Sequence, residues 1–405
     1  MNRNSSIHIL AKPTGPICNL DCKYCYYTEK EAYFPKDNQF RMSHSVLESY
    51  IQQYIESQDR QEIVFAWQGG EPTLLGLEFF QKAVSLQKKY ANGKRITNTL
   101  QTNGTLLNDE WCEYFSTHQF LVGLSLDGPE HIHNVYRIDR GGKPTFELVM
   151  RGISLLKKHH VEFNILTCVT KHSSYKPLEI YHFFKQQGIQ FIQFIPIVER
   201  KVNEEAIGLS LRHATPPSLS FEEAQKEVAP WTVESEMYGD FLIQIFNEWV
   251  QNDVGSIYVM NFEWALASWA GIPSPVCIFS EECGCAVAME HNGDLYSCDH
   301  YVYPEYRLGN ISDGLRNMMN QPSQLAFGKM KRDSLPSVCR KCEVRFACHG
   351  ECPKHRFLVT DDGEPGLNYL CSSYKKYFKH IDPYMTIMKQ MLQNGLPVSC
   401  IKKRH

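Results

Sequence analysis

Before residue 200, short apolar runs alternate regularly with segments of helical period, and this alternation limits what the chain can fold into. Six runs are typical of strands, at 7–12, 62–67, 96–101, 120–126, 161–169 and 189–197. Five segments between them repeat apolar residues three and four apart, as amphipathic helices do: 43–54, 77–90, 109–116, 145–158 and 175–187. Strand followed by helix predicts a parallel sheet with right-handed crossovers. An open doubly wound sheet and a partial TIM-like barrel both fit this count.

At 405 residues the chain is longer than one ordinary domain. After the α/β unit a polar, proline-bearing stretch breaks the rhythm, a helical pattern resumes, and short cysteine-rich segments follow that have too little core to fold without a metal. We therefore expect five parts: an α/β domain at 1–200, an excursion or linker at 201–235, a connecting helical segment at 236–276, a metal-stapled domain at 277–371 and a helical tail at 372–405.

Charge and hydropathy exclude several classes of protein. The 42 Lys and Arg residues against 45 Asp and Glu give a net charge of -3, which implies no general attraction to nucleic acid or to an anionic membrane. No stretch approaches the 18 or so apolar residues of a membrane span, and the start of the chain lacks a signal-peptide core. We therefore expect a cytoplasmic protein, in which 15 cysteines need an explanation.

Clustered cysteines in a reducing compartment more often bind metal or carry redox chemistry than form disulfides. Twelve of them fall into three groups: Cys18, Cys22 and Cys25; Cys277, Cys283, Cys285 and Cys298; and Cys339, Cys342, Cys348, Cys352 and Cys371. Cys112, Cys168 and Cys400 stand alone. Cys112 and Cys168 fit small buried thiols, so we assign them no function.

The first group lies in CNLDCKYCYY, directly after the first expected strand. Three thiolates can hold three irons of a [4Fe-4S] cluster and leave the fourth iron open, whereas a structural zinc would need a fourth ligand from elsewhere. Gln68-Gly69-Gly70-Glu71-Pro72 follows the second expected strand, where glycines supply a tight turn. In parallel α/β folds both segments would lie at the active-site edge of the sheet.

Together these motifs resemble those of the radical S-adenosylmethionine (SAM) enzymes, which combine this cysteine spacing, an aromatic residue such as Tyr24 and a Gly-Gly-Glu turn. The resemblance implies a partial (β/α)6 TIM-like barrel and a [4Fe-4S] cluster whose open iron binds SAM. One electron from the cluster would then cleave SAM to methionine and a 5′-deoxyadenosyl radical. By the same resemblance the residues that contact SAM are Tyr24, Gly70, Ser125, Arg137 and Val198.

The later cysteines resemble the SPASM extension of radical SAM enzymes that modify peptides. That likeness implies two auxiliary clusters, and so three [4Fe-4S] clusters in all. One set of ligands would be Cys277, Cys283, Cys298 and Cys352, and the other Cys339, Cys342, Cys348 and Cys371. Cys285 is then not a ligand, although spacing alone allows it to exchange with Cys283. Two four-cysteine zinc sites fit the same count.

The pattern of QTNGT, LSLDG, SCDHY and LNYLC, with the two motifs above, is similar to that of the anaerobic sulfatase-maturating enzymes over about residues 7–380. The resemblance implies oxidation of a Cys or Ser in a sulfatase segment of the type Cys/Ser-x-Pro-x-Arg to Cα-formylglycine, with electrons from a flavodoxin or ferredoxin. This chain departs from the pattern at HGECP, at the extra Cys285 and in its long excursion after residue 200.

The reaction needs a base as well as a radical. We expect Asp299, next to Cys298, to accept the substrate proton, because the relatives carry a catalytic aspartate at this position; His300 is the alternative. Two other functions fit part of the pattern. One is a SPASM enzyme that crosslinks a ribosomal peptide, and the other is a non-enzymatic iron–sulfur or zinc redox sensor. Failure to cleave SAM when reduced would favour the sensor.

Overall fold

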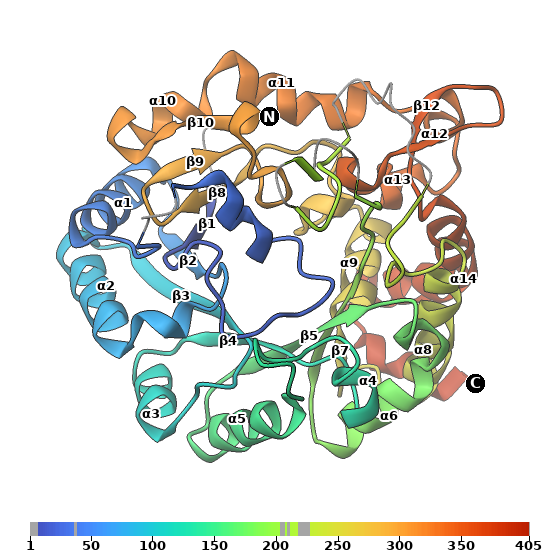
Figure 1. Cartoon of the computed structure of the whole chain (residues 1–405). Helices are drawn as coiled ribbons and strands as arrows, with labels where there is room; N and C mark the ends of the chain where they lie inside the picture. The colour runs from blue at the N-terminus through green and yellow to red at the C-terminus, as the bar shows by residue number, and fades with distance from the viewer. Residues whose placement is uncertain (1–6, 36–38, 203–206, 209–210, 218–226, 405) are drawn as a thin grey trace.

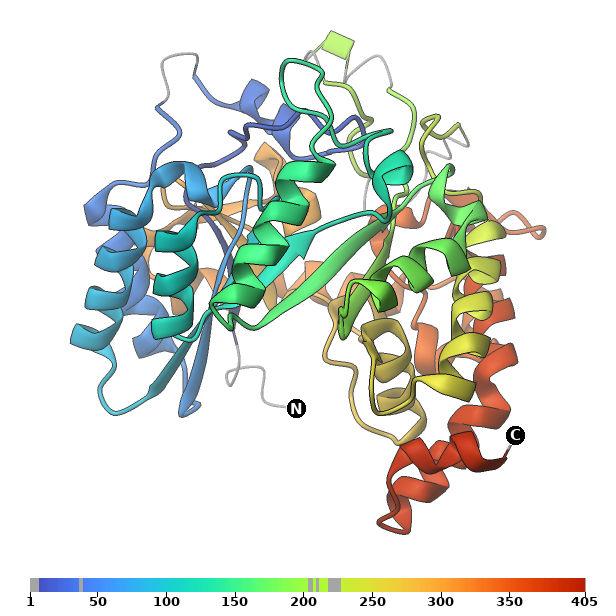
Figure 2. The same ribbon diagram turned by 90° about the horizontal axis from the view of Figure 1, so that it is seen from below.

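The structure, a computed structural model, describes residues 7–35, 39–202, 207–208, 211–217 and 227–404. Within these ranges one sheet has the strand order β10-β9-β8-β1-β2-β3-β4-β5-β6-β7. From β8 through β1 to β7 all neighbours run parallel, and only β9 and β10 are added antiparallel. The strands curve into an open ring with helices outside it, which is a partial barrel and not a flat doubly wound sheet (Figures 1 and 2).

All six expected strands are present, each within a few residues of its expected range. They are β1 (His8–Lys12), β2 (Glu62–Trp67), β3 (Arg95–Thr102), β4 (Leu121–Ser125), β5 (Phe163–Val169) and β6 (Phe191–Pro196). Four further strands extend the sheet: β7 (Tyr258–Val259), β8 (Ala286–Glu290), β9 (Asp294–Tyr296) and β10 (Arg307–Asn310). The alternation of strand and helix therefore predicted the barrel but not the strands that lengthen it.

The helices between the strands cover the outside of the barrel (Figure 1). They are α1 (His44–Ser57), α2 (Leu77–Tyr90), α3 (Asp109–Thr117), α4 (Glu130–His133), α5 (Phe146–Lys158) and α6 (Pro177–Gln186). Local chemistry explains where two of them begin. The Ser43 hydroxyl accepts the Val46 N–H before α1, and the Asn108 side chain accepts the Trp111 N–H before α3, so each helix starts at a capped residue.

The second half of the chain adds helices beside the barrel. They are α8 (Met237–Asn252), α9 (Met260–Trp269), α10 (Leu315–Met319), α11 (Pro322–Asp333), α12 (Ser337–Arg340), α13 (Arg345–Cys348) and α14 (Cys371–Gln393). A two-stranded ribbon, β11 (Leu358–Val359) and β12 (Pro365–Leu367), lies between α13 and α14. Helix α8 packs along α14, and both run down the same side of the molecule (Figure 2).

Strand β8 joins the cysteine-rich part to the barrel. It pairs in parallel with β1 over five positions, from His8 opposite Ala286 to Lys12 opposite Glu290. The sheet thus runs across the boundary expected at residue 277, and one hydrophobic core contains residues from both sides of it. Parts of the excursion expected at 201–235 lie outside the described residues. None of the helices in the described ranges is both long enough and apolar enough to span a bilayer.

Replacement of Gly239 by Ala tests the contact between α8 and α14. The added methyl carbon would lie 2.7 Å from the carbonyl oxygen of Ser373, so one helix must shift. We expect the free energy of unfolding to fall by about 1–3 kcal/mol, measured by urea denaturation. Gly208→Ala is the matched control, because its methyl would meet no atom within 4 Å. Equal stability of the two variants would contradict this account of the packing.

Candidate active site

The chain after β1 crosses the opening enclosed by the strands and carries the first cysteine group (Figure 1). Cys18 and Cys22 are buried and form a small apolar cluster with Leu20, Tyr24 and Ile197, and Cys25 packs against this cluster. Burial raises the pKa of Cys18 to about 12 and also raises that of Cys22, because a thiolate is poorly solvated there. The three thiols expected to hold one cluster are thus brought together.

The Gly-Gly-Glu turn after β2 holds this cysteine loop in place. A side chain on Gly70 would put its Cβ 2.0 Å from the carbonyl oxygen of Ile17, so only glycine fits there. The Glu71 N–H donates to the same Ile17 oxygen at 2.9 Å. The fully buried Glu71 carboxylate accepts hydrogen bonds from the Thr102 hydroxyl and the Asn103 N–H, at 2.7 and 2.8 Å. One glutamate therefore ties together the loops that follow β1, β2 and β3.

Asp127, which was not among the residues expected to contact SAM, organises two of those residues. Its buried carboxylate accepts the Tyr24 hydroxyl at 2.6 Å and the Arg137 Nε–H at 2.9 Å. Its other oxygen accepts the Cys168 N–H at 3.0 Å. Burial lowers the pKa of Arg137, but the Asp127 carboxylate outweighs that effect and raises it, so the guanidinium stays charged. Cys168 was expected to be only a buried thiol, and it lies 3.5 Å from Arg137 Nη2.

The remaining expected SAM contacts lie at the same edge of the sheet. Ser125 is the last residue of β4 and is buried two residues before Asp127. Val198 follows β6, but its side chain packs into the main core, whereas the neighbouring Ile197 packs against the cysteine loop. Tyr24, Ser125 and Arg137 are thus grouped by the fold, while the Val198 side chain points into the core.

Asp299 lies in a largely buried, charged cluster beside β1, in which its own side chain is 17% exposed. Its carboxylate forms an ion pair with Lys12, the last residue of β1, and accepts the Tyr26 hydroxyl at 2.7 Å. The Lys12 ammonium also lies 3.8 Å from the centre of the Tyr27 ring. Burial raises the pKa of Asp299, but Lys12, His300 and the hydrogen bonds outweigh it and lower the pKa to about 2. The carboxylate is therefore ionised near neutral pH.

His300, the alternative base, is turned toward the cysteines. Its Nδ1 atom lies 3.5 Å from the Cys352 sulfur, and its ring packs edge-on to Tyr26. Burial lowers its pKa to about 4, and the Lys354 ammonium contributes in the same direction. The imidazole is therefore neutral near pH 7.

The first auxiliary ligand set comes together in the structure. Burial raises the pKa of the Cys298 thiol, and the neighbouring Cys277, Cys352 and Cys283 raise it further. A buried lysine, Lys331, donates to the carbonyl oxygens of Cys277 and Ile278 at 2.7 and 2.8 Å, which fixes the turn that carries Cys277. The expected non-ligand Cys285 is exposed just before β8, and it contributes to the raised pKa of the nearby Cys283.

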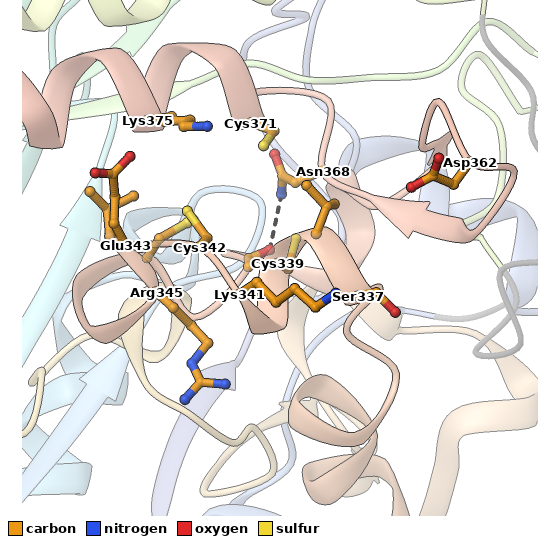
Figure 3. A pocket seen from close by; sticks show the side chains of 14 residues that line it. Ser337, Cys339, Lys341, Cys342, Glu343, Arg345, Asp362, Asn368, Cys371 and Lys375 are labelled. Atoms are coloured by element: carbon orange, nitrogen blue, oxygen red, sulfur yellow. Dashed lines mark hydrogen bonds between the residues drawn. The ribbon is translucent and has the colours of Figure 1, made fainter.

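The second auxiliary set surrounds a cavity of about 510 Å³ that is lined by Cys339, Cys342, Cys348 and Cys371. Cys339, Cys342 and Cys371 face one another across it, and Lys341, Arg345 and Lys375 lie around it (Figure 3). The thiols come from α12, from the turn after it, from the end of α13 and from the start of α14. Four thiols around such a space fit a cubane cluster. Among the described residues no three Cys, His, Asp or Glu side chains are grouped as one metal ion would require.

Comparisons with known proteins agree with this geometry. Residues 13–184 match the radical SAM superfamily, and residues 277–343 match the SPASM iron–sulfur cluster-binding domain. The serine-type anaerobic sulfatase-maturating enzyme of Bacteroides thetaiotaomicron is 48% identical over 389 residues, which cover 96% of this chain and 92% of the relative. The chain belongs to the family of anaerobic sulfatase-maturating enzymes.

Other members of the sulfatase-maturating family extend the comparison. The cysteine-type enzyme of Clostridium perfringens is 34% identical over 93% of this chain and 96% of its own length. A solved structure, native anSMEcpe with bound AdoMet, superimposes with a TM-score of 0.82 at 33% identity and covers 95% of this chain and 99% of that one. The predictions of a radical SAM fold with a SPASM extension and of an enzyme are confirmed, so a non-enzymatic redox sensor is no longer needed as an explanation.

Motifs alone gave no role to some residues of this sulfatase-maturating enzyme. Lys12 ends an apolar strand and Asp127 lies in a turn, so each has an ordinary structural explanation in the sequence. Asp299, the partner of Lys12, is distant from it in sequence. Arg137, the partner of Asp127, is separated from it by helix α4. The one usable signal was the position of each at the carboxyl end of a parallel strand.

Replacing Cys18, Cys22 and Cys25 together by Ala tests the first cluster. If each ligand set holds a [4Fe-4S] cluster, the anaerobically reconstituted chain carries about 12 irons and the triple variant about 8. SAM cleavage should be abolished, because the other two sets are fully ligated by cysteine. Iron analysis and assay of 5′-deoxyadenosine measure both effects, and Cys400→Ala is the control. SAM cleavage by the triple variant would contradict the assignment.

Asp127→Asn tests whether Asp127 orients the expected SAM contacts. An amide has one oxygen and one NH2 group, so it cannot accept from Tyr24, Arg137 and the Cys168 N–H at once. We expect SAM to bind about tenfold more weakly, measured by equilibrium dialysis under anaerobic conditions. Asp109→Asn removes an exposed carboxylate paired with Lys158 and should leave SAM affinity unchanged. If both variants bind SAM like the parent chain, Asp127 has no such role.

Proposed function

We propose that this chain oxidises a serine or cysteine of a sulfatase polypeptide to Cα-formylglycine, with cleavage of SAM to 5′-deoxyadenosine and methionine. The observation that carries the proposal is the position of Asp299. This ionised carboxylate lies next to Cys298 in the sequence, and it is held by Lys12 from the strand that also leads into Cys18. The carboxylate thus lies between the first and the second cysteine group, and we assign it as the acceptor for the substrate proton.

The donor groups fit the cofactors that the family implies. We assign the first cluster to Cys18, Cys22 and Cys25 and the two auxiliary clusters to the two sets of four cysteines, three [4Fe-4S] clusters in total. Tyr24, Gly70, Ser125, Arg137 and the main chain at Val198 would line the SAM site. When bound, SAM and the clusters would supply two things: a 5′-deoxyadenosyl radical, which removes a hydrogen atom from the substrate Cβ, and an acceptor for the second electron.

The chain's own residues handle the proton. Asp299 accepts it from the substrate oxygen or sulfur as the electron leaves. Lys12 contacts Oδ1 of the carboxylate and the Tyr26 hydroxyl donates to Oδ2, so the orientation of the carboxylate is set before the substrate arrives. The low pKa makes Asp299 a weak base, and it keeps the acceptor form fully populated near neutral pH. His300 is placed instead to contact Cys352.

The substrate assignment rests on the relatives. The sulfatase-maturating enzymes of Bacteroides thetaiotaomicron and Klebsiella pneumoniae are serine-type, at 48% and 37% identity, and that of Clostridium perfringens is cysteine-type, at 34%. We therefore propose a serine in a Ser-x-Pro-x-Arg-like segment as the first target to test, with cysteine as the second. A flavodoxin or ferredoxin is proposed as the external electron donor, and the cytoplasm as the location.

Anaerobic incubation with SAM, a reductant and a synthetic Ser-x-Pro-x-Arg or Cys-x-Pro-x-Arg peptide tests the activity. Mass spectrometry should show loss of two hydrogens from the serine peptide, or loss of two hydrogens together with exchange of sulfur for oxygen in the cysteine peptide. A crosslinked peptide that keeps the Ser or Cys would favour the peptide-crosslinking alternative. SAM cleavage without change in either peptide would contradict the proposed substrate.

Asp299→Asn separates radical formation from completion of the oxidation. The amide keeps the size of the side chain but cannot accept a proton near neutral pH. We expect formation of formylglycine to fall by about 10²-fold or more, while SAM cleavage continues. Deuterium placed at the target Cβ should still appear in 5′-deoxyadenosine. Because the pKa of Asp299 is about 2, activity of the parent chain should not decline from protonation of this group between pH 8 and 5.

Two outcomes of the Asp299 experiment are decisive. The control Asp361→Asn changes an exposed aspartate and should leave formylglycine formation unchanged. Parental activity of Asp299→Asn would show that Asp299 is structural and would direct attention to His300. Loss of iron from the variant would show instead that the side chain supports the neighbouring cluster.

A further inference from the structure

Arg356 is a buried cation whose hydrogen bonds all go to carbonyl groups. Its side chain is fully buried, and Nε donates to the Gly350 oxygen at 2.9 Å. Nη1 donates to the Lys331 oxygen at 2.7 Å, and Nη2 donates to the His349 oxygen at 2.9 Å. Gly350 lines the cavity of the second auxiliary set, and Lys331 holds the turn of Cys277 in the first. The guanidinium therefore lies between the two sets.

The backbone around Arg356 is shaped to hold it. His349, Gly350 and Glu351 all have left-handed backbone angles, with φ of 47°, 72° and 55°. This geometry is unfavourable for residues with a side chain. A Cβ on Gly350 would lie 2.5 Å from Arg356 Nη2. The HGECP segment, where the sequence departs from the pattern of its relatives, thus bends two carbonyl groups toward the guanidinium.

No carboxylate neutralises this charge. Within the described residues Arg356 forms no ion pair, and the nearby buried Glu351 is engaged by His355 and Asn368, at 2.8 and 2.7 Å. An arginine does not lose its proton in a protein, so it stays cationic. A buried charge without an opposite charge is strongly destabilising. Its charge interacts with the thiols of Cys339, Cys348, Cys283 and Cys352, and also with the buried ammonium of Lys331.

We infer that Arg356 is a tuning residue that lies between the two auxiliary clusters, neutralises part of their negative charge and raises the reduction potential of both. The inference rests on the proposed cluster assignment. A [4Fe-4S] cluster with four thiolates carries negative charge, which increases on reduction. A fixed cation close to it stabilises the reduced form, and net charge is one of the factors that set cluster potentials. A higher potential makes the clusters better acceptors for an electron from the substrate.

Redox titration followed by electron paramagnetic resonance tests the inference. The parent is the full chain with Cys18, Cys22 and Cys25 changed to Ala, so that only auxiliary clusters contribute. Arg356→Gln should move the midpoints of both clusters to more negative values, because one positive charge is lost. Arg356→Lys keeps the charge and should stay closer to the parent. Arg332→Gln is the matched control, since the Arg332 side chain is 41% exposed and is paired with Glu282 and Asp333.

A second measurement keeps the inference testable if Arg356→Gln holds its clusters poorly. The gain in Tm when the apo chain is reconstituted with iron and sulfide should be smaller in Arg356→Gln than in the parent, because the variant has one buried positive charge fewer for the clusters to neutralise. Unchanged midpoints in a variant that keeps about 8 irons, or an equal gain in Tm, would overturn the role of Arg356. A parent that binds far fewer than about 8 irons would instead contradict the cluster assignment.

Discussion

Strand β1 is hydrogen-bonded to β2 on one side and to β8 on the other, and the arrangement of the site depends on these two pairings. The pairing with β2 places the cysteine loop next to the Gly-Gly-Glu turn. The pairing with β8 puts Lys12 opposite Glu290, and the chain then returns to Asp299 beside Lys12. A parallel register therefore brings the first cysteine group and the proposed base into one site, although most of the chain separates them.

How much of this could be read from the sequence differs between local and non-local features. The first six strands and their helices follow from apolar periodicity, so they were predicted to within a few residues. Strands β8 to β10 are three to five residues long and lie among glycines and cysteines, where periodicity gives no signal. The pairing of β8 with β1 joins distant parts of the chain. For that reason the expected division at residue 277 did not anticipate a continuous sheet.

The candidate site shows the same limit. Cysteine spacing and family motifs identified the thiols, which the fold gathers into three groups. They gave no role to Lys12, Asp127 or Arg356, although Asp127 lies in one of the motifs, because each acts through a contact that only the folded chain makes. Lys12 forms an ion pair with Asp299, and Asp127 forms one with Arg137. Such pairs are tolerated in a buried site because each charge is matched. In the described part of the chain no carboxylate pairs with Arg356, so its buried charge needs another explanation.

Burial of the thiols also links cluster assembly to protons. The low-dielectric surroundings raise the pKa of Cys18 to about 12 and raise those of Cys22, Cys298 and Cys352. In the metal-free chain, the raised pKa values of these thiols favour the folded state below the ordinary thiol pKa, where the thiols are neutral. This contribution to stability is lost as the pH rises through the raised pKa values. A cluster binds thiolates, so its assembly must displace these protons. With the proposed ligand sets, iron would supply the charge that makes buried thiolates stable, and folding would depend on the metal most where the thiols are most deeply buried.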